Sequence, residues 1–173
     1  SADGRFVAFI SDATNVVPDD TNGVTDVFVR DRLMDVTTRV NLTNDATQTS
    51  LPSFLPTISG NGRYVVFASY DNFGVENILS GLFIHDLDKS ETKYLSGCDG
   101  SPVISNDGRY VASICWGVEG FAVQLLDQKT GSIELVGVMS KTRPGGPLVG
   151  SEEISISGDG RFVAFWSVLE LLP

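Results

Sequence analysis

The chain has 173 residues, of which 42% are hydrophobic, and its 22 acidic and 12 basic side chains give a formal net charge of −10. This length suits one ordinary domain with a sizeable core. The acidic balance excludes nucleic acid as a partner, because phosphates require a basic surface, and no apolar run approaches the roughly 18 residues of a membrane helix. We therefore expect no membrane insertion, and the charge suits a cation or a basic partner.

The phrase S-x-[DN]-G-R-[FY]-V-[AV] is written four times, starting at Ser1, Ser59, Ser105 and Ser157. The spacing is irregular but close to the roughly 40–50 residues of a four-stranded propeller blade. Each phrase predicts a hairpin, because Asp or Asn starts the turn and Gly accepts the positive φ that other residues resist.

The strands follow in a regular order along the chain. The first phrase leads into a β-branched and aromatic strand at 5–9 and then into a second hairpin, "DVFVRDRLMDVTTRV". The second and third units repeat this order and add a short strand before the phrase, as at 56–59. The fourth unit has a strand at 153–157, the phrase and one more strand. No stretch predicts a helix of ordinary length.

This pattern predicts one partial domain, 1–173, with approximate repeat units 1–42, 43–96, 97–138 and 150–173. The units contribute three, four, four and two strands in turn. The connection "MSKTRPGGPLVG" at 139–150 is predicted to be an irregular, exposed loop.

Antiparallel repeats of four strands are typical of β-propellers. The phrase followed by "VFVRD" resembles the WD-like repeats of TolB-type β-propellers, bacterial proteins whose blades carry an S-x-D-G-[RK] turn. The resemblance covers nearly the whole chain. It implies an all-β fold, an arc of about three to three and a half four-stranded antiparallel blades. It also implies a bacterial source and favours the periplasm or secretion over the cytoplasm.

Propellers usually have about four to eight blades, so the predicted arc is incomplete. Two explanations stay open. The chain is a fragment of a longer propeller, or two copies close one ring of six or seven blades as a homodimer.

The stretch "PDDTNGVTDVF" is the candidate metal site. Asp19, Asp20, Asn22 and Asp26 offer side-chain oxygens within eight residues, and Gly23 permits a sharp turn. Because Ca²⁺ binds several carboxylate, amide and carbonyl oxygens, these four residues are predicted calcium ligands. The alternative is an Asx-rich surface loop held by hydrogen bonds from side chains to the backbone.

Other polar side chains recur once per unit. The repeated arginines are predicted to form structural clamps with a nearby carboxylate or carbonyl, and an anion-binding ring is the alternative. They are Arg5, Arg63, Arg109 and Arg161. Asp31, Asp86 and Asp127 each end an apolar strand, which favours turn and cap roles over acid–base catalysis. The single histidine, His85, aligns with Arg30 and Leu126 and is interpreted as a variable strand position.

The two cysteines, Cys98 and Cys115, flank the third phrase. If the strand before that phrase extends far enough back, the two residues oppose each other across the hairpin. A disulfide then requires a Cα separation of about 4.4–6.8 Å, and its presence favours an oxidising compartment. The glycines beside Cys98 leave open whether the strand ends too early.

The sequence contains no G-x-S-x-G nucleophile elbow, phosphate loop or dinucleotide fingerprint. The preferred interpretation is a noncatalytic TolB-like module that binds or scaffolds a protein or peptide, without a cofactor other than Ca²⁺. The alternative is the propeller portion of a larger hydrolase or peptidase whose catalytic domain is absent from this sequence. A fold-level resemblance does not decide between them, because propellers host very different activities.

Overall fold

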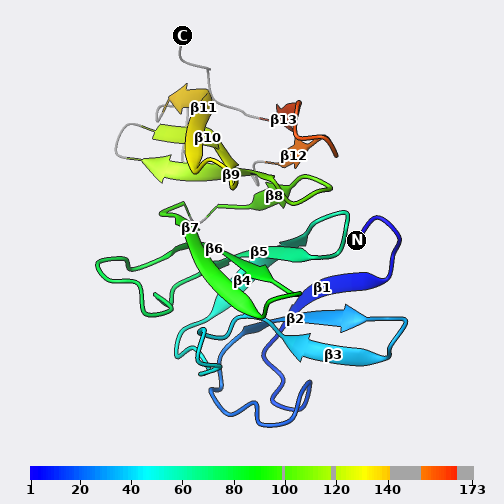
Figure 1. Ribbon diagram of the computed structural model, residues 1–173. Coiled ribbons are helices and arrows are strands. Elements are labelled where there is room, and N and C mark those ends of the chain that lie inside the picture. The colour runs from blue at the N-terminus through cyan, green and yellow to red at the C-terminus, as the bar shows by residue number, and fades with distance from the viewer. Residues whose placement is uncertain (99, 118–119, 141–152, 167–173) are drawn as a thin grey trace.

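The computed structural model describes residues 1–98, 100–117, 120–140 and 153–166 (Figure 1). These residues form 13 strands and no helix. The first sheet contains β1 (Phe6–Ser11), β2 (Asp26–Asp31) and β3 (Val36–Arg39). The second contains β4 (Ser53–Ile58), β5 (Tyr64–Ser69), β6 (Gly81–Asp86) and β7 (Glu91–Ser96). The third contains β8 (Pro102–Ile104), β9 (Tyr110–Gly117), β10 (Gly120–Asp127) and β11 (Ser132–Ser140), and the last contains β12 (Ile154–Ile156) and β13 (Val163–Phe165).

All neighbouring strands within these sheets are antiparallel and follow chain order. The first strands of successive sheets lie side by side, because β4 contacts β8 and β8 contacts β12 (Figure 1). The last strands, β3, β7 and β11, lie at the opposite edge of their sheets. The all-β arc of four-stranded antiparallel units predicted from the repeats is therefore confirmed.

The repeated phrase forms the predicted turn in all four units. In the third unit the Ser105 hydroxyl donates to Asp107 Oδ1 at 2.7 Å and accepts the Tyr110 N–H at 3.0 Å. The Arg109 N–H donates to Asp107 Oδ1 at 3.0 Å. The glycine of each turn has a positive φ, as only glycine does at low cost: Gly4 at 70°, Gly62 at 75°, Gly108 at 81° and Gly160 at 73°.

The same glycines have a second role, which is to receive the aromatic residue of the preceding unit. A Cβ on Gly62 would overlap the Phe6 ring, one on Gly108 would overlap Tyr64, and one on Gly160 would overlap Tyr110. Glycine and aromatic side chain therefore fit together across each of these three junctions.

The first two units also share the largest apolar cluster. Val27, Val29 and Val40 of the first unit pack with Val65, Phe67 and Phe83 of the second. Backbone bonds join the turns as well, since Ala2 N–H donates to the Gly60 carbonyl at 2.9 Å and Asn106 N–H to the Gly158 carbonyl at 2.8 Å. The units are thereby held at fixed positions relative to one another.

Cys98 and Cys115 form a disulfide with a Cα–Cα distance of 4.6 Å. The condition considered for this pair, a strand extending back to Cys98, is not met. β8 begins only at Pro102, which pairs with Ser113, so Cys98 lies in the connection before β8 and not in the strand. Both half-cystines are nearly inaccessible, and the bond ties the start of the third unit to β9.

Two predicted segments fall mainly outside the described residues. The connection at 139–150 is one, although β11 extends through its first two residues, Met139 and Ser140. The end of the last predicted strand, beyond residue 166, is the other.

Candidate functional site

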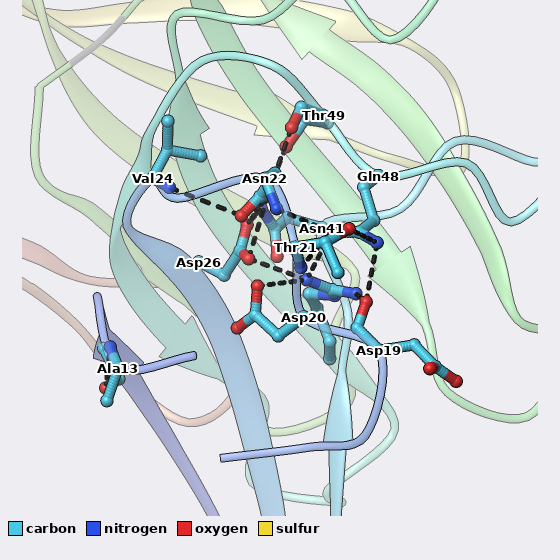
Figure 2. A network of polar contacts seen from close by, with 12 residues as sticks. Ala13, Asp19, Asp20, Thr21, Asn22, Val24, Asp26, Asn41, Gln48 and Thr49 are labelled. Carbon is cyan, nitrogen blue, oxygen red and sulfur yellow. Dashed lines mark hydrogen bonds and ion pairs between the residues drawn. The ribbon is translucent and has the colours of Figure 1, made fainter. Parts of the chain in front are cut away.

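The predicted calcium loop folds against a buried arginine at one end of the first unit. Arg39, at the end of β3, donates through Nη1 to Asp20 Oδ1 at 3.0 Å and to Asp26 Oδ2 at 2.9 Å. The exposed fractions of the three side chains are 7%, 4% and 0%. The guanidinium thus contacts both carboxylates. Figure 2 shows Asp20 and Asp26 in the network that joins the loop before β2 to the segment after β3.

Three amide side chains complete this network. Asn41 Nδ2 donates to Asp26 Oδ1 at 2.6 Å, and Asn22 Nδ2 donates to Asp26 Oδ2 at 3.0 Å. Gln48 Oε1 accepts from Arg39 Nη1 at 3.1 Å. Each Asp26 oxygen thus has at least one donor, as a carboxylate with no solvent exposure requires.

The structure brings together three of the four predicted calcium ligands. Asp20, Asn22 and Asp26 belong to the network, while the Asp19 side chain points away from it and only the Asp19 carbonyl takes part, accepting from Gln48 Nε2 at 2.7 Å (Figure 2). Among the described residues no three or more His, Cys, Asp or Glu side chains gather as a metal site. Calcium binding here stays a prediction, and the ion would have to compete with the Arg39 guanidinium for the same oxygens.

Three of the repeated arginines form the predicted clamps. Arg5 Nη2 lies 2.6 Å from Asp31 Oδ2, and the equivalent Nη2–Oδ2 distance is 2.7 Å for both Arg63–Asp86 and Arg109–Asp127. The hydrogen bonds from Arg5 hold the pKa of Asp31 at about 2, below its usual value. The Arg109 hydrogen bonds likewise depress the pKa of Asp127.

These clamps are structural because each carboxylate also caps the turn that follows it. Asp31 Oδ1 accepts the N–H of Leu33 at 2.9 Å, and Asp127 Oδ1 accepts the N–H of Lys129 at 2.9 Å. The turn and cap roles predicted for the strand-end aspartates are confirmed.

His85, on β6, is buried and its Nδ1 lies 3.0 Å from the Thr92 hydroxyl. Burial lowers its pKa, so the ring is neutral near neutral pH. The Thr92 hydroxyl in turn donates to the Leu42 carbonyl at 2.8 Å. Thr92 thus joins the second unit to the first, and His85 supports it from a buried position on β6, which fits the interpretation of a strand position.

A groove of about 770 Å³ lies at the other end of the first unit, between the first and second units. We call it the open groove. The first unit contributes a mostly apolar wall, and the second unit contributes the rim formed by its turns. The wall includes Met34, Val36 and Thr38, and the rim includes Gly62, Leu87 and Asp88.

At the equivalent position between the second and third units lie two smaller spaces, of about 270 and 110 Å³. We call it the filled groove. Its wall carries Lys89, Glu91 and Lys93, where the open groove has Met34, Val36 and Thr38. Its rim carries Gln128 and Lys129, where the open groove has Leu87 and Asp88.

The sequence analysis missed the open groove. The signal was available in the second hairpins, where "LMDVT" of the first unit aligns with "DKSET" of the second. Only the structure shows that these side chains face the next unit across a gap.

Solved structures with a similar fold are known, although sequence comparisons find no match. No family model matches the chain, and no curated protein matches it. A structure of TolB from Acinetobacter baumannii matches with a TM-score of 0.58 at 15% identity, over 98% of this chain and 38% of that one. A putative TolB from Agrobacterium tumefaciens matches with a TM-score of 0.58 at 18% identity, over 97% of this chain and 57% of that one.

The chain is an arc of a β-propeller. The propeller domain of the Trilobed protease from Pyrococcus furiosus is similar as well, with a TM-score of 0.55 at 13% identity over 98% of this chain and 54% of that one. Identities this low show the fold alone, and the chain spans only 38% and 57% of the two TolB structures. None of the described residues forms a helix long and apolar enough to cross a membrane. The repeat units are the blades of this propeller.

Proposed function

We propose that this chain is a noncatalytic propeller module that binds a peptide or protein segment in the open groove between its first and second blades. The observation that supports it is the difference between two equivalent positions. One junction is lined by long polar side chains and has spaces of about 270 and 110 Å³, whereas the other has a groove of about 770 Å³. Binding pockets of this size are usually concave, largely apolar and few per protein.

The exposed apolar side chains beside the groove favour the same function. Leu33, Met34 and Val36 are 73%, 63% and 52% exposed on the β2–β3 hairpin. An adjoining group of exposed apolar side chains marks an interaction site more often than scattered single ones do. The inter-blade contacts make this surface rigid, which lowers the entropy lost on binding.

Selection from a random dodecapeptide library on the immobilised chain tests this function. The matched control carries Met34→Lys, Val36→Glu and Thr38→Lys, which are the side chains of the second blade at the same exposed positions. Enriched peptides should bind the control at least tenfold more weakly. No enrichment, or equal binding to both proteins, would overturn the proposal.

We also propose that the chain resides in the periplasm or outside the cell. The Cys98–Cys115 disulfide supports this location, because such bonds persist in oxidising compartments and are rare in the cytosol. A thiol titration of unfolded protein, taken directly from the cells that make it, should find no free thiol, and two free thiols would contradict the location.

The alternative function is the propeller portion of a larger hydrolase or peptidase. It draws support from the similar propeller domain of the Trilobed protease, of whose solved chain the match covers 54%. The full gene decides between the two, because a segment with a nucleophile elbow next to this one would favour the alternative.

Closure of the ring by a second copy is a separate proposal. Among the described residues β1 pairs only with β2. Its other edge can therefore accept a further strand, at the place where β4 pairs with β5 in the second blade. Native mass spectrometry of the untagged chain should show a dimer, and a purely monomeric, folded species would overturn this proposal.

A further inference from the structure

The residue after each strand-end aspartate occupies an equivalent place in the first three blades. These residues are Arg32, Leu87 and Gln128. The N–H of each donates at 2.9 Å to the carbonyl of the repeat arginine: Arg32 to Arg5, Leu87 to Arg63 and Gln128 to Arg109. Because the backbone is the same, differences at this position come from the side chain alone.

In two of the three blades this side chain caps the glycine of the repeated turn. Arg32 Nη1 donates to the Gly4 carbonyl oxygen at 2.9 Å, and Gln128 Nε2 donates to the Gly108 carbonyl oxygen. The cap satisfies a carbonyl that the turn leaves without an intramolecular partner.

Leu87 cannot donate, so the second blade has no such cap. No described residue donates a hydrogen bond to the Gly62 carbonyl oxygen. Gly62 and Leu87 both line the open groove. The groove therefore presents an acceptor at the place where the other two blades supply their own donor.

Asp88 places an exposed carboxylate in the lining of the same groove. Asp88 stands where the third blade has Lys129, and its side chain is 69% exposed. The two guanidinium groups that line the groove, Arg5 and Arg63, are already bound to Asp31 and Asp86. Asp88 Oδ2 also lies 3.2 Å from Arg63 Nε, but most of the Asp88 side chain stays accessible to a ligand.

We propose that the open groove binds a peptide through an arginine side chain next to an apolar one. The ligand guanidinium takes the place that Arg32 has in the first blade, donating to the Gly62 carbonyl and pairing with Asp88. The neighbouring apolar side chain packs against Met34 and Val36. This inference rests on the proposed function and names the chemistry of its partner.

The internal repeat supplies the strongest support for this ligand. Arg32 shows that a guanidinium fits the turn glycine of this blade type at 2.9 Å. The acidic net charge of −10 favours approach of a basic peptide. Arginine is preferred over lysine because its planar donors can contact the carbonyl and the carboxylate together.

An NMR titration of the ¹⁵N-labelled chain with acetyl-Leu-Arg-Leu-amide tests the inference. We expect saturable shifts of the amide signals of Arg63, Leu87 and Met34. Replacing the peptide arginine by glutamine or glutamate should weaken binding about tenfold or more, since a charge-assisted hydrogen bond is lost. Equal binding of the three peptides would overturn the inference.

Two variants of the chain provide the matched controls. Leu87→Gln inserts the cap of the third blade and should keep the fold while weakening the arginine peptide about tenfold. Leu87→Arg inserts the cap of the first blade and should do the same. Undiminished binding to a folded Leu87→Gln protein would contradict the inference even if Leu87→Arg failed to fold.

The library selection separates this inference from the proposed function. Enriched groove-binding peptides that contain arginine beside an apolar residue support both. Enriched groove-binding peptides without a basic residue support the proposed function and overturn the inference. Failure of both the library and the tripeptide overturns both.

Discussion

The open groove and the filled groove are built on the same backbone but present different surfaces. Both have the repeated turn, the arginine clamp and an aromatic ring packed on the next glycine. They differ where side chains face the gap, with Met34, Val36 and Leu87 in one and charged or amide side chains in the other. The repeats therefore keep the groups that hold neighbouring blades together and vary those that a ligand would contact.

The loop ends of the first two blades differ in a similar way. Asp26 and Arg39 form a buried ion pair in the first blade, and the equivalent positions in the second are Gly81 and Tyr94. A Cβ on Gly81 would lie 2.8 Å from the Tyr94 ring, so the aromatic ring fills the space that the ion pair occupies in the first blade. One backbone thus accommodates a polar and an apolar solution.

The largest loss of stability is expected when the buried ion pair of the first blade is broken. Asp26→Ala leaves the buried Arg39 without its inner carboxylate, and removing one partner of a buried pair typically costs about 3–5 kcal/mol. Urea unfolding followed by fluorescence measures the loss. A change below about 1 kcal/mol would show that water or a bound ion compensates the charge.

The control replaces the ion pair by the glycine and tyrosine found at the equivalent positions of the second blade. The double variant Asp26→Gly/Arg39→Tyr removes both charges and supplies the aromatic ring, so it should be much more stable than Asp26→Ala. Calcium added to the wild-type protein gives a further readout in the same assay. A concentration-dependent rise in the unfolding midpoint would indicate that the ion binds this loop despite Arg39.

The next effect concerns the third blade, whose first strand is short. β8 has 3 residues, whereas β4 has 6, and the disulfide holds the segment before β8 against β9. Replacing both cysteines by serine opens a short loop and should cost about 3 kcal/mol. Reduced wild-type protein should lose the same stability in urea, whereas identical midpoints with and without reductant would contradict the prediction.

The fold was predictable because its signals are local and repeated. The S-x-[DN]-G-R phrase encodes a turn through its own hydrogen bonds, and its four copies mark the four repeat units. The clamp was predictable for the same reason, since arginine and aspartate recur at matching places. The register of Cys98 was not, because the hairpin pattern does not say where β8 starts.

The sites were harder to predict because they depend on partners far apart in the sequence. The loop from Asp19 to Asp26 contains oxygens suited to calcium, but two of its carboxylates pair with Arg39, which the motif does not include. The open groove depends on Leu87 facing Met34 across a blade junction. Neither contact follows from residue types or spacing within one hairpin.

The clamp common to both grooves predicts an effect of acid. Because Arg5 lowers the pKa of Asp31 from 3.8 to about 2, the folded state favours the ionised carboxylate. That stabilisation is complete above pH 4 to 5 and is lost as the pH falls through about 2. In Arg5→Gln the pKa of Asp31 should rise toward 3.8, as measured by NMR titration, and Arg30→Gln should leave it unchanged. An unchanged Asp31 pKa in Arg5→Gln would contradict the role of the clamp.

The smallest effect on stability is expected when the filled groove is opened. Gln128→Leu removes the cap on Gly108 and should cost about 1 kcal/mol, the usual value of one hydrogen bond. It should not create a site for acetyl-Leu-Arg-Leu-amide, because Lys129 and the neighbouring Lys89 and Lys93 repel the guanidinium.

Adding Lys129→Asp to Gln128→Leu gives the filled groove the carboxylate that Asp88 provides in the open groove. The double variant should therefore bind acetyl-Leu-Arg-Leu-amide weakly. If the single variant already binds the peptide as the open groove does, then the uncapped carbonyl is sufficient and charge does not select the ligand. If neither variant binds, the apolar wall formed by Met34 and Val36, which the filled groove lacks, is the feature that separates the two junctions.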